Sequence, residues 1–100
     1  MSSNETLRVV ARVTAQAGKD GEVKAILLAL VGPARQDPGC IGYELLQSLD
    51  DPCDFTFVEE WASDADMQAH LATPHVQSAL SQALSLLAAE PDIRRYATIA

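Results

Sequence analysis

Four stretches of the chain alternate apolar and polar residues in the manner of β-strands. Residues 7–14 read LRVVARVT, a β-branched and roughly alternating run that predicts the first strand. Similar runs predict strands at residues 41–49, 55–61 and 93–99. In the third of these strands, Phe55, Phe57 and Trp61 are expected on one face and Val58 on the other; in the second, Ile41, Tyr43 and Leu45 are expected to oppose Leu46.

Two other stretches follow the period of an α-helix. From Lys19 onward apolar residues recur at helical spacing as far as Ala34, and Pro33 is expected to kink or end this helix. A second helix is predicted after Ser63, an N-cap candidate with Asp66 three residues later. Its apolar stripe, which restarts after a Thr-Pro pair, consists of Met67, Leu71, Val76, Leu80, Leu84 and Leu87.

The resulting order β-α-β-β-α-β predicts an α+β protein with a ferredoxin-like fold. Residues 37–39 read as a turn, and residues 50–54 read as the loop of a hairpin between the second and third strands. Two helices cover only one face of a four-stranded sheet, although both faces carry apolar groups. We therefore expect a homodimer in which two sheets pack face to face.

The charge and composition of the chain argue against several kinds of partner and location. The 100 residues have a net charge of −7, which argues against nucleic acid and anionic membranes as partners. The longest apolar run, residues 25–31, is too short to cross a bilayer, and the first residues lack a signal pattern, so we expect a cytoplasmic protein. We expect a flexible segment at residues 1–6 and a single domain at residues 7–100. Cys40 and Cys53 are expected to be free thiols.

The densest group of chemically useful side chains lies between Glu59 and Val76. It contains both histidines and the only tryptophan, Trp61. His70 falls between apolar positions on the helical wheel and is expected to face the core or a cavity. His75 is expected in the first turn of the restarted helix, where the helix dipole disfavours an imidazolium. A neutral imidazole can accept a proton, as a general base must.

Each of these residues also has an ordinary structural interpretation. An inward histidine is more often a hydrogen-bonded core residue than a catalyst, and His75 can serve local capping alone. Trp61 can simply fill the core. Glu59 and Glu60 can be a strand pair with one side chain inward and the other solvated. Taken singly, each of these residues favours the structural interpretation.

Neither a metal nor an organic cofactor is expected from the sequence. His70 and His75 are five residues apart, roughly 140° around a helix, which does not match a zinc-binding HExxH helix. No third ligand is evident in the sequence. Residues 17–21 after the first strand contain glycine but lack the spacing of a dinucleotide or phosphate loop.

Three motifs together resemble a known family. They are DPGCIGY at residues 37–43, FVEEW at residues 57–61 and AHLATPHV at residues 69–76. In this order they are similar to the antibiotic biosynthesis monooxygenase family, and within it to the quinol monooxygenase-like branch, over residues 7–99. The resemblance implies a dimeric α+β barrel with an apolar pocket between sheet and helices. It also implies oxygenation of phenolic or quinol-like aromatics by O2 without flavin, haem or metal.

The resulting hypothesis is a cofactor-independent monooxygenase or oxidase of a small aromatic, with His70 or His75 as general base. Tyr43 and Trp61 are expected to pack against the substrate ring. Glu60 is expected to orient a histidine, and Arg12 to stabilise an oxyanion. Two alternatives remain open: a non-catalytic ligand-binding dimer, and an O2-independent isomerase that acts on a small signal metabolite.

Overall fold

The computed structural model describes residues 6–100, so five of the six residues predicted as a flexible segment lie outside the described part. The elements follow the predicted order, with the second helical region divided into three pieces. They are β1 (Leu7–Thr14), α1 (Asp20–Arg35), β2 (Cys40–Gln47), β3 (Asp54–Trp61), α2 (Asp64–Leu71), α3 (Pro74–Ala83), the 3₁₀ turn η1 (Leu84–Leu86) and β4 (Asp92–Ala97).

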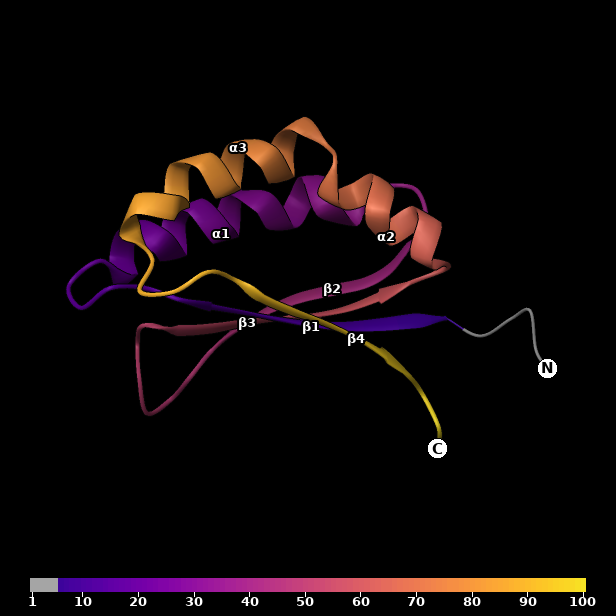
Figure 1. Ribbon diagram of the computed structural model, residues 1–100, viewed down its shortest axis with the longest axis horizontal. Helices are drawn as coiled ribbons and strands as arrows, with labels where there is room; N and C mark the ends of the chain where they lie inside the picture. Colours follow the sequence, from indigo (N-terminus) through magenta and orange to yellow (C-terminus); the bar gives the residue numbers. More distant parts are fainter. Residues whose placement is uncertain (1–5) are drawn as a thin grey trace.

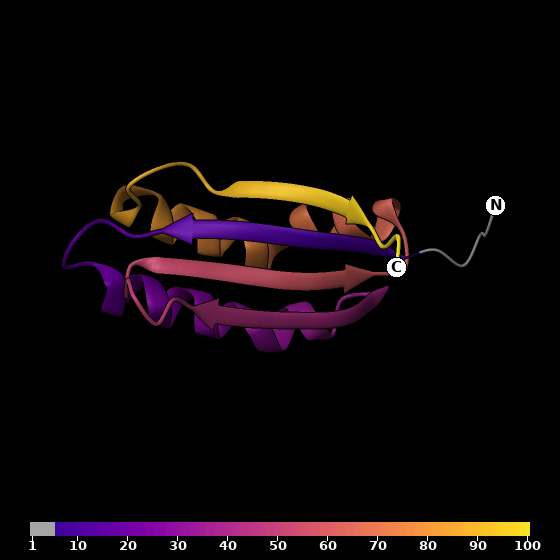
Figure 2. The same ribbon diagram turned by 90° about the horizontal axis from the view of Figure 1, so that it is seen from below.

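The four strands form one antiparallel sheet in the order β2-β3-β1-β4. All three helices lie on the same side of this sheet (Figure 1), and the view from below shows the strands uncovered (Figure 2). This arrangement confirms the predicted α+β, ferredoxin-like fold. The helix-covered face holds the core, whose largest fully buried side chains are Trp61, Phe55, Met67, Val9 and Val23.

The first helix and the second strand differ from prediction in detail. Pro33 lies within α1 and does not end it, because the helix continues to Arg35. A register irregularity between Cys40 and Gly42 interrupts the alternation of β2. Cys40 consequently pairs with the buried Trp61, while Ile41 is 55% exposed. Ile41 was predicted to point the same way as Tyr43 and Leu45; its exposure beside the buried Tyr43 departs from that prediction, because the bulge shifts the alternation of the strand.

The apolar stripe of the last helix was also predicted with the wrong phase. The Thr73 side chain accepts a hydrogen bond from the Val76 amide, so α3 begins anew at Pro74. The helix buries Val76 together with two alanines, Ala79 and Ala83. Leu84, which falls in the 3₁₀ turn beyond the helix, is 63% exposed. Small residues at the contact allow α3 to lie close to α1, and leucine spacing alone does not reveal this.

Two other predictions can be compared with the structure. Cys40 and Cys53 are both free, as expected. Among residues 6–100, no helix has the length and apolar character needed to cross a bilayer.

Candidate active site

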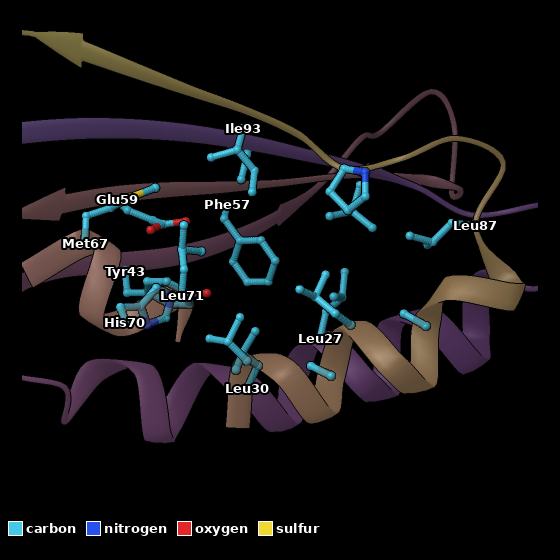
Figure 3. Close-up of a pocket in the computed structure, with 17 residues that line it drawn as sticks. Leu27, Leu30, Tyr43, Phe57, Glu59, Met67, His70, Leu71, Leu87 and Ile93 are labelled. Carbon is cyan, nitrogen blue, oxygen red and sulfur yellow. The ribbon is translucent and has the colours of Figure 1, made fainter. Parts of the chain in front are cut away.

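An apolar cavity of about 70 Å³ lies between the helix-covered face of the sheet and the helices. A single buried water needs about 10–15 Å³ of such space, so the cavity has room for a small organic molecule. Most of its lining is aliphatic. Three polar side chains, Tyr43, Glu59 and His70, lie together at one end, while Leu27 and Leu87 lie toward the other (Figure 3). The cavity therefore has a polar end and an apolar end.

The turn between α1 and β2 brings a carboxylate to the polar end. Gly39 has a φ of 82°, a conformation that favours glycine, and a Cβ at this position would collide with Asp66 in the first turn of α2. The turn and α2 are thus held against each other. Asp37, at the start of this turn, reaches the side chain of His70 near the end of α2.

A single oxygen of Asp37 contacts both histidines. Its Oδ2 lies 2.7 Å from Nδ1 of His70 and 2.8 Å from Nε2 of His75. Partial burial raises the pKa of Asp37, but the hydrogen bonds from the two histidines outweigh it, and the net pKa is lowered. The side chain is therefore an ionised carboxylate near neutral pH.

This contact fixes the protonation of His70. An ionised carboxylate has no hydrogen to donate, so Nδ1 of His70 must carry the proton and donate it to Asp37. The other ring nitrogen, Nε2, then has a free lone pair, and it has no hydrogen-bond partner within residues 6–100. Burial lowers the pKa of His70, although Asp37 partly counteracts this effect. His70 is consequently a neutral imidazole that can accept a proton at Nε2.

Aromatic rings hold the imidazole in place. Trp61 packs against His70 with ring centroids 4.5 Å apart, and Tyr43 packs against it edge-on at 5.5 Å. His70 is only 3% exposed. The inward position predicted for His70 is confirmed, and the residue lines the cavity.

The other sequence-predicted residues are distributed unevenly around the cavity. Tyr43 lines it, whereas Trp61 lies behind His70 and is not part of the lining. Glu60 accepts a hydrogen bond from the Thr6 hydroxyl at 2.6 Å and does not contact a histidine. Arg12 lies on the uncovered face of the sheet and pairs with Asp54 at 3.2 Å.

The carboxylate beside the histidines is thus Asp37, not Glu60. From the sequence, Asp37 is predicted only as part of a turn and of the first family motif, with no chemical role. Nothing in the spacing of the sequence connects it to His70 and His75, which are 33 and 38 positions away.

Glu59 is a further polar residue of the cavity to which the sequence analysis gave no function. It is 5% exposed, and its Oε1 accepts a hydrogen bond from the Trp61 indole at 2.8 Å. Burial raises the pKa of Glu59 to about 7, although the hydrogen bond from Trp61 acts in the opposite direction. Burial likewise raises the pKa of Tyr43. The alternation of β3 did indicate one inward glutamate, because position 59 lies between the inward Phe57 and Trp61.

His75 belongs to a different surface. It lies in the first turn of α3, as predicted, and its side chain is 29% exposed. It does not line the cavity. It lines instead an open groove of about 360 Å³ between α1 and α3.

The three residues around the shared oxygen are also a potential metal site. The ligand atoms of Asp37, His70 and His75 all lie within 4.8 Å of one another, so the structure supplies the third ligand that the sequence did not reveal. Two imidazoles and a carboxylate are a known ligand set for non-haem iron. The distances of 2.7 and 2.8 Å, however, are those of charge-assisted hydrogen bonds that satisfy all three groups without an ion.

Comparisons with known proteins agree with this fold. The family model described as antibiotic biosynthesis monooxygenase matches residues 6–82. A curated Synechocystis protein, described as uncharacterized protein sll1783, is 26% identical over 94 residues. This match covers 94% of the present chain, which spans 64% of the length of that relative.

Two solved structures are similar over their full length. The crystal structure of PA3566 from Pseudomonas aeruginosa has a TM-score of 0.92 and 29% identity, and the match covers 100% of both chains. A crystal structure named antibiotic biosynthesis monooxygenase has a TM-score of 0.89 and 26% identity, and the match covers 94% of this chain and 99% of that one. The matched family model includes β1, the Asp37 turn, Glu59 and both histidines, and on that basis this chain belongs to the antibiotic biosynthesis monooxygenase family.

Proposed function

We propose that the protein is a cofactor-independent monooxygenase of a small phenolic or quinol-like aromatic, with His70 as the general base. The contact between Asp37 and His70 at the polar end of an apolar cavity carries this proposal. The carboxylate holds the tautomer of His70 whose free Nε2 lone pair is available to a bound phenol. Family membership supports a monooxygenase-like role, and the geometry of the cavity supports His70 as the base. The phenolic substrate class is what the family resemblance implies.

The proposed chemistry requires only the substrate and O2. His70 removes the phenolic proton, because a phenolate gives an electron to O2 far more readily than a phenol does. The resulting phenoxyl radical and superoxide combine at a ring carbon, and the imidazolium returns its proton to give a hydroperoxide. Loss of water from the hydroperoxide leaves a carbonyl on that carbon. One oxygen atom enters the product, the other becomes water, and the substrate supplies all four electrons.

The lining of the cavity favours an uncharged aromatic substrate. Aliphatic side chains hold a ring and exclude water, while Tyr43 offers a hydroxyl that hydrogen-bonds to nothing else in residues 6–100. No Lys or Arg in the described part of the chain lines the cavity. A phosphorylated signal molecule would lack a cationic partner here, which disfavours the isomerase alternative.

We also propose that two copies of the chain associate through the uncovered faces of their sheets. Proteins of this family commonly form homodimers. The uncovered face carries Leu46 and Tyr96, which are 49% and 47% exposed in the single chain. Burying these side chains against a second copy would remove apolar surface from water.

Oxygen uptake with a panel of hydroquinones and anthrone-like phenols tests the enzymatic proposal. Each substrate is measured with a chelator present, beside a blank without protein, because quinols oxidise spontaneously. His70→Ala is the test variant. Gln82→Ala, in the exposed groove between α1 and α3, is the matched control.

We expect uptake above the blank that is insensitive to the chelator, lost in His70→Ala and retained in Gln82→Ala. Uptake no faster than the blank throughout the panel would overturn the proposal. Binding of these phenols without oxygen consumption would then indicate the non-catalytic ligand-binding alternative. Light scattering on the same samples measures the dimer, and a monomer at micromolar concentration would overturn that part.

A further inference from the structure

Glu59 is a buried acid that the chemistry proposed above does not use. It projects from the middle strand pair into the helix-covered side, where it lines the cavity beside His70 and Tyr43 (Figure 3). One of its oxygens, Oε1, accepts the hydrogen of the Trp61 indole. The other, Oε2, has no partner among residues 6–100, although the residue is 95% buried, at 5% exposure. Oε2 is not among the fully enclosed side-chain atoms without a partner, so it stays open to the cavity, where a ligand can reach it.

No cation lines the cavity beside the Glu59 carboxyl group, because Arg8 reaches only the backbone carbonyl of Glu59 and Arg35 only the backbone carbonyl of Tyr43. The neighbouring strand β2 presents Cys40 and Tyr43, and α2 presents His70, which is held neutral as described above. The cavity-lining residues of β1, α1, α3 and β4 are all apolar. A carboxyl group in such a site retains its proton to unusually high pH, in keeping with its raised pKa.

We propose that Glu59 is the acid of this cavity, which donates a hydrogen bond to an oxygen of the bound aromatic and, during turnover, the proton that releases water. This inference rests on the proposed function and adds a second residue to it. His70 and Glu59 line the same end of the cavity, so one can take a proton while the other gives one.

The step at which Glu59 acts is the loss of water from the hydroperoxide. His70 removes the hydrogen on the peroxide-bearing carbon as a proton, and the C–H electron pair becomes the second bond of a carbonyl. The O–O bond breaks, and the distal OH leaves with the bonding electrons. It takes the proton of Glu59 and departs as water. The imidazolium then returns its proton to the Glu59 carboxylate, so both side chains end as they began.

Glu59→Gln tests this role with little change of shape, because an amide oxygen can still accept the Trp61 hydrogen. With anthrone as substrate we expect kcat for oxygen uptake to fall at least about tenfold while KM changes little. Wild-type kcat should decline as pH rises through about 7, the pKa of Glu59, because the acid form is lost. This decline should be absent from the residual activity of Glu59→Gln. A variant with wild-type kcat and the same alkaline decline would overturn the proposal.

A binding measurement separates this inference from the proposed function. Calorimetric titration with naphthol, at a pH below 7, compares the wild type with Glu59→Gln and Glu59→Leu. Since the amide can still donate a hydrogen bond, Glu59→Gln should bind within about threefold of wild type, and Glu59→Leu at least about tenfold more weakly. If the wild type consumes no oxygen, the monooxygenase proposal and the water-forming step both fail. Equal naphthol affinity for the wild type and Glu59→Leu would overturn the binding role of Glu59 whatever the oxygen result.

Discussion

The cavity and the outer groove meet at the same carboxylate oxygen of Asp37 but offer their histidines very different surroundings. On the cavity side, His70 is 3% exposed and packed between aromatic rings. On the groove side, the His75 side chain is 29% exposed at the start of a helix. The hydrogen bonds to Asp37 are nearly equal, at 2.7 and 2.8 Å.

Burial, and not the shared partner, therefore distinguishes the two histidines. Burial lowers the pKa of His70 and keeps its free nitrogen away from bulk water, so that nitrogen meets only what enters the cavity. His75, by contrast, lines the open groove and is partly exposed to solvent. The proposed base therefore lies on the cavity side, and the following experiments test that proposal.

Removal of the cavity-side imidazole should have the largest effect. We expect His70→Ala to lower kcat for oxygen uptake by about 10²- to 10⁴-fold, the usual contribution of a general base. Steady-state oxygen consumption measures this change, with light scattering to confirm that the oligomeric state is preserved. Activity within about threefold of wild type would contradict the proposal that the cavity-side histidine is the base, since the buried histidine would then have no chemical role.

The effect of burial on the cavity side can be measured without any substrate. The pKa of Glu59 is about 7 in the folded protein against an ordinary value of 4.5. The folded state thus binds more protons between these pH values, and stability is lost as pH rises through this range. The difference corresponds to a loss of about 3 kcal/mol at most.

Glu59→Gln should be free of this loss. Urea unfolding at pH 4 should give similar free energies for the wild type and Glu59→Gln, whereas at pH 8 the variant should be the more stable by up to about 3 kcal/mol. The difference between the two proteins removes contributions from other titrating groups. An equal difference at both pH values would show that Glu59 is not desolvated by the cavity.

Neutralising the shared carboxylate should have an intermediate effect. Asp37→Asn retains an oxygen acceptor but removes the negative charge that stabilises an imidazolium at His70. We expect kcat to fall about 10- to 100-fold, as is typical when a partner that orients a functional histidine is changed. Since the pKa of Asp37 is lowered in the fold, this variant should also lose less stability than wild type as pH falls below about 4. Wild-type activity in Asp37→Asn would show that His70 does not depend on this contact.

Substitution of His75, on the groove side, should have the smallest effect on kcat. Glutamine at position 75 can still donate a hydrogen bond to Asp37, so we expect His75→Gln to alter kcat by less than about threefold. The same oxygen assay measures it. A loss as large as that of His70→Ala would reverse the comparison and place the base in the groove.

Much of the fold was readable from local patterns. The alternation of residues 7–14, the helical spacing after Lys19 and the Ser63 cap all predicted elements that the structure contains. The predictions of buried residues were wrong where one extra residue in a strand, or an alanine at a helix contact, changes which side chains of the element face the core. In β2, a bulge leaves Ile41 exposed. In α3, the buried side consists of Val76 and two alanines, and not of the predicted leucines. Such shifts depend on the packing partner and leave no periodic signal in the sequence.

The candidate site was only half predictable. Helical spacing placed His70 inward, and strand alternation placed Tyr43 on the face opposite to Leu46, in agreement with their exposed fractions of 4% and 49%. The partner of His70 was misassigned to Glu60, because proximity in sequence is a poor guide to contacts across a fold. Asp37 reaches the histidines only because the turn after α1 packs against α2.

The order of the elements, the inward position of His70 and the resemblance to the family follow from the amino-acid sequence alone, because each depends on residues close together in the chain. The folded chain was needed to show that Asp37 contacts His70 and His75, that Arg12 lies on the opposite face of the sheet and that Glu59 borders the cavity. Hydrogen bonds and desolvation depend on which groups meet in space, and the sheet brings together side chains that are distant along the chain.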